Sequence, residues 1–218
     1  KSSQQRKNTL HLMIYKKLAI LIQTFGKGNM MAEVHRHLVE HLEWNGEGTL
    51  LDIGCGAAAL TVRCAKTFPK AQITAMDYWG AEWNYAKEQC EKNARIEGIS
   101  DRVTFQKGDA AKLDFADETF DAAVSNFVFH EVHSAKDKRD VVREALRVVK
   151  KGGAFSFQDM FSQEALYGDM DAFVKQLKAE GISEIHYIGN LEKKLDAIPG
   201  YVTTPWMISG MGIIYGKK

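Results

Sequence analysis

The sequence predicts an α/β fold in which helices cover both faces of a parallel sheet. The first reason is Thr49–Lys66, TLLDIGCGAAALTVRCAK, which reads as a buried strand, a glycine turn and a helix. The second is that short apolar runs alternate with helical segments from there to Gln158. The third is that no clear helix separates the last two apolar runs, Glu184–Ile188 and Met207–Tyr215, which predicts a closing hairpin with an antiparallel edge strand.

Length and composition limit the classes of protein. A chain of 218 residues with a net charge of +1 suits one α/β domain, residues 47–218, preceded by a helical cap or lid, residues 1–46. The near-zero charge gives no case for nucleic acid as a partner. The three cysteines form no CxxC pair, which favours a reducing, cytoplasmic location. No apolar run reaches the roughly 18 residues needed to span a bilayer. The oligomeric state is left open.

The glycine turn predicts a nucleotide-binding corner. Gly54 and Gly56 let backbone N–H groups approach a ligand that a Cβ would block, and Asp52 lies beside them. Asp77 ends the next apolar run, about 20 residues after Gly56, the spacing at which a carboxylate can hydrogen-bond a ribose hydroxyl.

The remaining elements follow from periodicity and turn residues. Helices are expected at about Met30–Trp44, Ala58–Thr67, Ala81–Glu97, Lys138–Val149 and Asp169–Glu180, and further strands at Gln72–Met76, Val103–Gln106, Phe120–Ser125 and Ala154–Gln158. Polar residues follow these strands, namely Asp77, Asp109, Asn126 and Asp159. In open α/β sheets ligands bind at such strand ends, so we expect the site there.

Residues 1–30 contain an apolar stripe among basic residues. Leu10, Ile14, Leu18, Leu21 and Phe25 recur at three or four residues, and the segment has six Lys or Arg and no Asp or Glu. We interpret it as a cap helix packed over the domain. The alternative is peripheral contact between Lys1–Met30 and a membrane or an anionic lipid.

Three histidines lie on the second predicted helix. His37 and His41 are four residues apart and could share a metal, with His35 nearby. A metal site needs a third ligand, and none is close in sequence. We therefore interpret them as surface or substrate-side residues and expect no metal.

Five motifs in order carry a family resemblance. The corner LLDIGCG, the acid in AMDYW, the KGDA turn, the strand FDAAVSN and the segment LRVVKKGGAF resemble those of a class I S-adenosylmethionine-dependent methyltransferase, over about Gly48 to Gln158. The resemblance implies a Rossmann-like, doubly wound sheet of seven strands with an antiparallel last strand, and S-adenosyl-L-methionine as the cofactor.

The resemblance also implies roles for single residues. Gly54, Cys55 and Gly56 would pass under the methionine and ribose portion, and Asp52 would orient the amino group, directly or through water. Asp77 would hold both ribose hydroxyls. Tyr78 or Trp79 would lie against the adenine, and Asp109 would accept from its amino group, within the turn formed by Gly108, Asp109 and Ala110. Asn126 would lie beside the methionine amino end.

Two observations bear on the competing cofactor. The turn reads Gly54-Cys-Gly56-Ala-Ala-Ala59. Judged by this corner by itself, an NAD-dependent oxidoreductase also fits, because Ala is permitted at the last glycine position of the dinucleotide-binding motif. The Asp109 element and the glycine pair before the fifth strand favour methyl transfer. Ala58 stands where the family often has a third glycine, and its small side chain should preserve the helix packing.

Methyl transfer requires alignment of a nucleophile with the methyl carbon, and a base helps when the nucleophile is a hydroxyl or a protonated amine. His130, four residues past Asn126, is the candidate general base, since an imidazole titrates near neutral pH. A structural role for His130 is the alternative. Glu131 and His133 are weaker candidates for the base.

The acceptor should be a small, partly apolar molecule, because the segments outside the match carry aromatic and Met residues. Candidate substrate-binding residues are Tyr15, Met30, Phe129, His133 and Asp159. The sequence after the fourth strand, SNFVF, lacks the motif usual for amino methylation of DNA bases. A membrane-associated lipid methyltransferase and a cofactor-binding protein without turnover are the alternatives.

Overall fold

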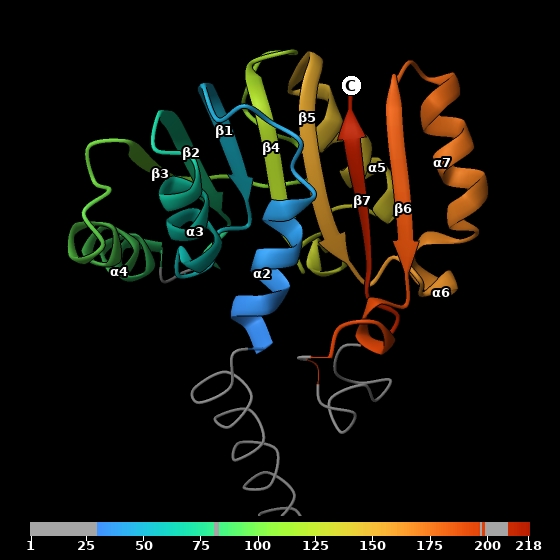
Figure 1. Ribbon diagram of the computed structural model, residues 1–218, viewed down its shortest axis with the longest axis horizontal. Coiled ribbons are helices and arrows are strands. Elements are labelled where there is room, and N and C mark those ends of the chain that lie inside the picture. The colour runs from blue at the N-terminus through green and yellow to red at the C-terminus, as the bar shows by residue number, and fades with distance from the viewer. Residues whose placement is uncertain (1–29, 81–82, 197, 199–208) are drawn as a thin grey trace, which may run out of the picture.

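The computed structural model describes residues 30–80, 83–196, 198 and 209–218. The apolar stripe of Leu10–Phe25, the candidate Tyr15 and most of the predicted cap therefore lie outside the described residues. One sheet organises the described chain, and Figure 1 shows it face-on with its helices in front and behind.

The sheet has seven strands in the order β3-β2-β1-β4-β5-β7-β6. Their bounds are β1 Gly48–Ile53, β2 Ala71–Asp77, β3 Val103–Lys107, β4 Phe120–Asn126, β5 Val149–Asp159, β6 Glu184–Gly189 and β7 Gly212–Lys217. The pairs β1–β2, β2–β3, β1–β4 and β4–β5 are parallel. The predicted doubly wound sheet is confirmed, and the strand order reverses between β1 and β4.

The last strand is antiparallel, as predicted, but it does not lie at the edge. Strand β7 pairs antiparallel with both β5 and β6, so β6 forms the edge. A hairpin prediction places the two final strands together and cannot tell which of them pairs with β5. Buried Ile213 and Ile214 show that β7 packs on both of its faces, which an interior strand requires.

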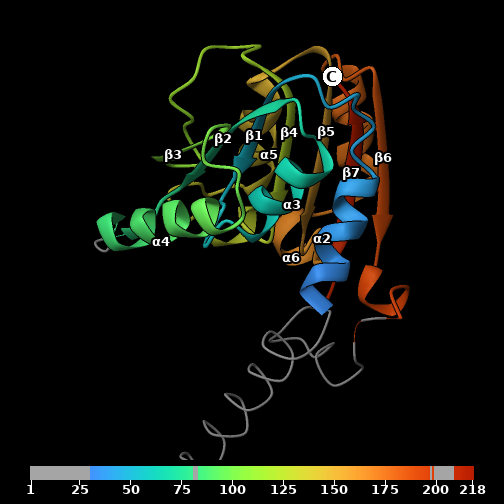
Figure 2. The same cartoon turned by 60° about the vertical axis from the view of Figure 1, so that its left-hand side comes forward.

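The described helices form two layers (Figures 1 and 2). Helices α2 (Met30–Glu40), α3 (Ala59–Thr67) and α4 (Trp83–Ile96) belong to one side, and α5 (Lys138–Arg147), α6 (Glu164–Tyr167) and α7 (Met170–Ala179) to the other. Alternation along β1 separates the two cores. Leu50 packs with the α3 side, whereas Leu51 and Ile53 pack with the α5 side.

Several boundaries differ from the prediction, and two of them meet at the junction of α5 and β5. The helix beginning at Lys138 ends at Arg147 instead of Val149, and β5 begins at Val149 instead of Ala154. The sequence KKGG reads as a turn, but the N–H of Gly152 donates to the carbonyl of Lys218, and Lys150 holds Asp121 at 2.7 Å. Pairing with residues distant in sequence therefore extends the strand. The short helix α6 is absent from the prediction.

Candidate active site at the carboxyl edge of the sheet

A cavity of about 620 Å³ opens where the strand order reverses, at the carboxyl ends of β1 to β4. Most of the predicted cofactor residues share its wall. Its lining consists of Gly54, Gly56, Met76, Asp77, Tyr78, Gly108, Asp109, Ala110, Asn126, Phe127, Val128, Glu131, Val132, His133 and Ser134.

The two glycines of the turn serve different purposes. Gly54 has φ +76, and a Cβ there would lie 2.1 Å from Cγ2 of Val128, so the turn and the segment after β4 fit only without a side chain. Gly56 has φ +53, and a Cβ there would meet no atom of the described residues within 4 Å, apart from its own neighbours in the chain. The bare backbone of Gly56 therefore leaves space in the cavity that a ligand can use.

Asp77 ties the end of β2 to the glycine turn. Its Oδ2 accepts from the Gly56 N–H at 2.7 Å and its Oδ1 from the Trp79 N–H at 3.2 Å. Trp79 has φ 43, and its Nε1–H donates to the Gly56 carbonyl at 3.0 Å. Trp79 thus holds the turn from outside the cavity wall, while Tyr78, 63% exposed, lies on the wall. Of the two aromatic candidates for the adenine, Tyr78 lines the cavity, and Trp79 is not among its lining residues.

Asp109 follows β3 and lines the same cavity. Its Oδ1 accepts from the Ala111 N–H at 2.9 Å and from the Ser134 hydroxyl at 3.1 Å. These bonds orient the carboxylate and connect it to the segment that follows β4. Gly108 and Ala110 flank it on the wall, as predicted.

Asp52 lies beneath the turn and not on the cavity wall. It shares a face of β1 with Leu50 and is fully buried, where Thr61 Oγ1 donates to its Oδ2 at 2.5 Å. Its Oδ1 is buried without a hydrogen-bond partner among the described residues. Burial, opposed by the Thr61 bond and reinforced by the charge of Asp77, raises the pKa of Asp52 to about 7. Cys55 is also buried and off the wall.

Asn126 is held by two side chains far apart in sequence. Its Oδ1 accepts from Gln158 Nε2 at 3.0 Å, and its Nδ2 lies 3.3 Å from Nε2 of His35. His35 is 9% exposed, so the surface half of its interpretation as a surface or substrate-side residue is wrong. Burial and the nearby charge of Arg63 lower the pKa of His35 to about 4, and the ring is neutral at physiological pH.

His130 is not among the residues that line the cavity. Its Nδ1 lies 2.6 Å from Oδ1 of Asp159, and its Nε2 lies 3.2 Å from a carboxylate oxygen of Glu131. Burial alone would lower the pKa of His130, but the bond to Asp159 and the charges of Asp159 and Glu131 outweigh it and raise that pKa. Glu131, not His130, is the member of this array that lines the cavity.

Three predicted substrate residues lie elsewhere. Phe129 packs against Phe157 and Phe161 in the core, and Met30 is buried among apolar residues beside Met160. Asp159 is fully buried, and its oxygens accept from protein donors, including the backbone N–H of Phe129 and of Met160. His133, by contrast, is exposed and lines the cavity.

The wall combines apolar surface with negative charge. Asp77, Asp109 and Glu131 line it, and no Lys or Arg is among its described lining residues. Such a wall favours a ligand that carries hydroxyl or amino donors and a positive charge. A sulfonium compound with a ribose and an amino group meets both requirements, so the residues present fit S-adenosylmethionine.

Several residues that line the cavity were not predicted from the sequence as site residues. Met76, Phe127, Val128, Val132 and Ser134 line the cavity, and Phe127 adopts φ 55. Apolar side chains in a loop give no sequence signal that separates cavity wall from core.

Within residues 30–80, 83–196, 198 and 209–218, no three His, Cys, Asp or Glu side chains are grouped to hold a metal ion. None of the helices described there combines the length and apolarity needed to cross a bilayer.

Sheet order, glycine turn and acidic strand ends define a Rossmann-like cofactor-binding protein of the class I methyltransferase type. The model of the methyltransferase domain family matches residues 51–157. The chain belongs to the class I S-adenosylmethionine-dependent methyltransferase family.

Known proteins show similarity over most of the chain. A sterol 24-C-methyltransferase of Aspergillus fumigatus is 28% identical over 203 residues, covering 79% of this chain and 52% of its own length. A geranyl diphosphate methyltransferase solved with S-adenosylmethionine has a TM-score of 0.64 at 18% identity, over 86% of this chain and 88% of its own. The cyclase SpnF has a TM-score of 0.61 at 20% identity, over 85% and 80%. The chain spans about half the length of the first curated relatives it matches.

Proposed function

We propose that this protein transfers a methyl group from S-adenosylmethionine to a small-molecule acceptor. The observation that carries the proposal is the acidic cavity at the switch point, with the open backbone of Gly56 on its wall. Relatives named as methyltransferases support it.

The cofactor supplies an electrophilic methyl group on a positively charged sulfur. In this proposal Asp77 accepts from the ribose hydroxyls, Asp109 accepts from the adenine amino group, and Tyr78 packs against the base. Asn126, with one amide N–H directed to His35 and its oxygen to Gln158, faces the amino acid end. Asp52 acts from beneath the turn, where it accepts a hydrogen bond from Thr61 and contributes negative charge near the cofactor.

The acceptor is proposed to be small and partly apolar. Phe127, Val128 and Val132 supply apolar wall beside the acidic groups, which suits a molecule with a hydrocarbon portion. The sterol methyltransferase relatives are consistent with this class. The second candidate acceptor is a membrane-bound lipid, reached through the basic segment Lys1–Met30. If the acceptor is a small molecule instead, we propose that the protein acts in the cytoplasm.

His130 is proposed as the general base, with Glu131 passing the proton from the cavity. Asp159 orients the imidazole, and Glu131 joins its Nε2 to the cavity wall. Only a neutral imidazole accepts a proton, and the pKa of His130 is raised. Turnover should therefore rise with pH through that raised pKa, and Glu131→Gln should reduce turnover with little change in cofactor affinity.

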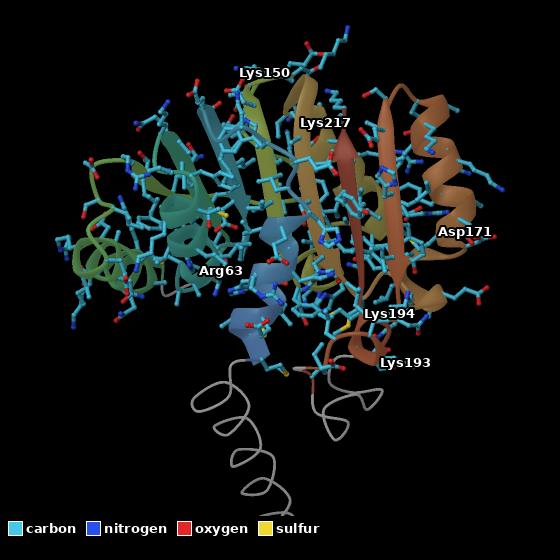
Figure 3. All side chains as sticks on the ribbon, viewed as in Figure 1. Arg63, Lys150, Asp171, Lys193, Lys194 and Lys217 are labelled. Atoms are coloured by element: carbon cyan, nitrogen blue, oxygen red, sulfur yellow. The ribbon has the colours of Figure 1, made fainter. Side chains whose placement is uncertain are left out.

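Calorimetry with S-adenosylmethionine and its homocysteine product tests the cofactor. We expect both to bind wild type, and Asp77→Asn to weaken both; the exposed Asp171 on α7, labelled in Figure 3, provides the control Asp171→Asn. If neither compound binds to the wild-type protein, the proposal is overturned.

A panel of small acceptors with radiolabelled methyl donor then tests turnover. Cofactor binding without transfer to any acceptor would favour a non-catalytic cofactor-binding protein. Co-sedimentation with anionic vesicles that is lost in the double variant Lys16→Glu, Lys17→Glu would favour the lipid methyltransferase.

A further inference from the structure

A second groove, of about 500 Å³, lies between α2 and α3. His35 and Met31 of α2 face Val62, Arg63 and Lys66 of α3 across it, and Glu97 also lines it. Figure 3 labels Arg63 on the part of α3 that faces α2. The groove is distinct from the cofactor cavity, since no residue lines both.

Arg63 supplies unused hydrogen-bond donors to this groove. Its side chain is half-buried, and it has no hydrogen bond or ion pair with any residue in the described part of the chain. Arg139 and Arg143, by contrast, are paired: Arg139 holds Asp137, and Arg143 holds Glu180. A guanidinium carries five N–H donors in a fork that matches carboxylate and phosphate oxygens, so an unpaired one beside a groove is suited to an oxyanion.

His35 supplies a second donor. Its Nε2 accepts from the Asn126 amide at 3.3 Å, which places the proton of the neutral ring on Nδ1. Nδ1 has no hydrogen-bond partner among the described residues. Lys66 is engaged by the Glu97 carboxylate, so its charge is largely compensated. Arg63 and His35 thus offer N–H groups in this groove that have no acceptor among the described residues.

We propose that the α2–α3 groove binds the carboxylate or phosphate group of the methyl acceptor through Arg63 and His35. The proposal rests on the proposed function and narrows its acceptor to an anionic molecule. His35 contacts Asn126, which lines the cofactor cavity. One hydrogen-bonded pair therefore separates the groove from the cavity, so an acceptor held by its anionic end can extend toward the cavity.

Isothermal titration with inorganic pyrophosphate and with acetate tests the groove directly. We expect saturable binding of at least one probe to wild type, at least tenfold weaker binding to Arg63→Gln, and partial retention in Arg63→Lys. Arg95→Gln, at an exposed position on α4, is the matched control and should equal wild type. Equal binding by wild type and Arg63→Gln, or no binding to wild type, overturns the site. S-Adenosylmethionine affinity, measured on each variant, should be unchanged and reports that the cofactor site is intact.

Turnover with paired acceptors tests the assignment to the substrate. Arg63→Gln should raise the KM of anionic acceptors at least tenfold and leave their kcat and the KM of neutral analogues nearly unchanged. Equal effects on anionic and neutral acceptors would contradict the anionic substrate class. If no acceptor is methylated while pyrophosphate binding still depends on Arg63, the proposed function fails and the groove is a site for a free oxyanion.

Discussion

The imidazole of His130 and the buried carboxylate of Asp159 are joined by a contact of 2.6 Å between Nδ1 and Oδ1. Oδ2 of the same carboxylate accepts from the Phe129 N–H at 2.7 Å. Asp159 thereby ties the end of β5 to the segment after β4, which forms one wall of the cavity. The wall is positioned by this carboxylate whether or not His130 takes part in proton transfer.

Asp159→Asn should lower the free energy of unfolding by about 3–5 kcal/mol, because an amide N–H₂ would face buried N–H donors and leave the histidine without its charge partner. Urea denaturation near neutral pH measures this loss. The exposed Asp171→Asn should change stability by less than about 0.5 kcal/mol, and a loss from Asp159→Asn as small as that would contradict the role assigned to the carboxylate.

Asp52→Asn should stabilise the cofactor-free protein, and more at high pH. Burial raises the pKa of Asp52 to about 7 from 3.8, so between these values the folded state holds a proton that the unfolded state has lost. The contribution of Asp52 to the free energy of unfolding of the wild-type protein therefore falls as the pH rises from about 4 to about 7. The asparagine of the variant does not titrate, so its contribution stays constant. We expect the advantage of Asn to grow by about 2–3 kcal/mol between pH 5 and pH 8. Denaturation curves at both pH values measure it, and a pH-independent difference would refute the shift.

Alanine at the two glycines of the turn should separate stability from binding. Gly54→Ala should cost about 3 kcal/mol or more, since its Cβ would lie 2.1 Å from Val128 Cγ2 at a positive φ. Gly56→Ala should cost only about 1–2 kcal/mol of strain, while its Cβ enters the cavity and weakens S-adenosylmethionine binding about tenfold, or about 1.4 kcal/mol. Thermal melts of the two variants measure the stabilities, and calorimetry measures cofactor binding. A Gly54→Ala variant more stable than Gly56→Ala would contradict the close approach of Gly54 to Val128.

His35→Gln should make the protein less sensitive to acid. The lowered pKa of His35, about 4, means that the unfolded chain binds a proton between pH 6.5 and 4 while the folded protein does not. This group therefore removes stability as pH falls, by about 2–3 kcal/mol over that range. Glutamine removes this contribution, and His37, whose pKa is also lowered to about 4 by burial and by His41, leaves a residual one. Unfolding curves from pH 7 to pH 4 test this, and a loss of stability in His35→Gln equal to that of wild type over this range would contradict it.

Trp79→Phe should loosen the glycine turn. The change removes the Nε1–H that donates to the Gly56 carbonyl and keeps an aromatic ring in the core, so the expected loss is about 1 kcal/mol. Cofactor affinity should fall because Gly56 is less restrained. Comparison with Tyr78→Phe separates the two aromatics: that variant keeps the ring on the cavity wall and should leave stability unchanged. An unchanged cofactor affinity in Trp79→Phe would remove it from the support of the turn.

Local sequence pattern was sufficient for the sheet, the turn and the strand-end acids. The alternation of apolar runs predicts the parallel strands because strand and helix periods are local properties, and Asp77, Asp109 and Asn126 lie on the wall because strand ends converge at one edge. The roles assigned to them at the cofactor stay predictions.

Only tertiary structure decided where side chains at those ends point and which distant groups they meet. The alternation of side chains along β1 directs Asp52 toward α3, where it meets Thr61. The hydrogen-bond partners of Asn126 come from α2 and β5. His130 turns to Asp159, the strand β7 lies inside the sheet, and Arg63 meets His35 across a groove. These relations join residues far apart in the chain. The sequence by itself determined the cofactor class through short motifs, while the acceptor side depends on long-range packing that no local pattern encodes.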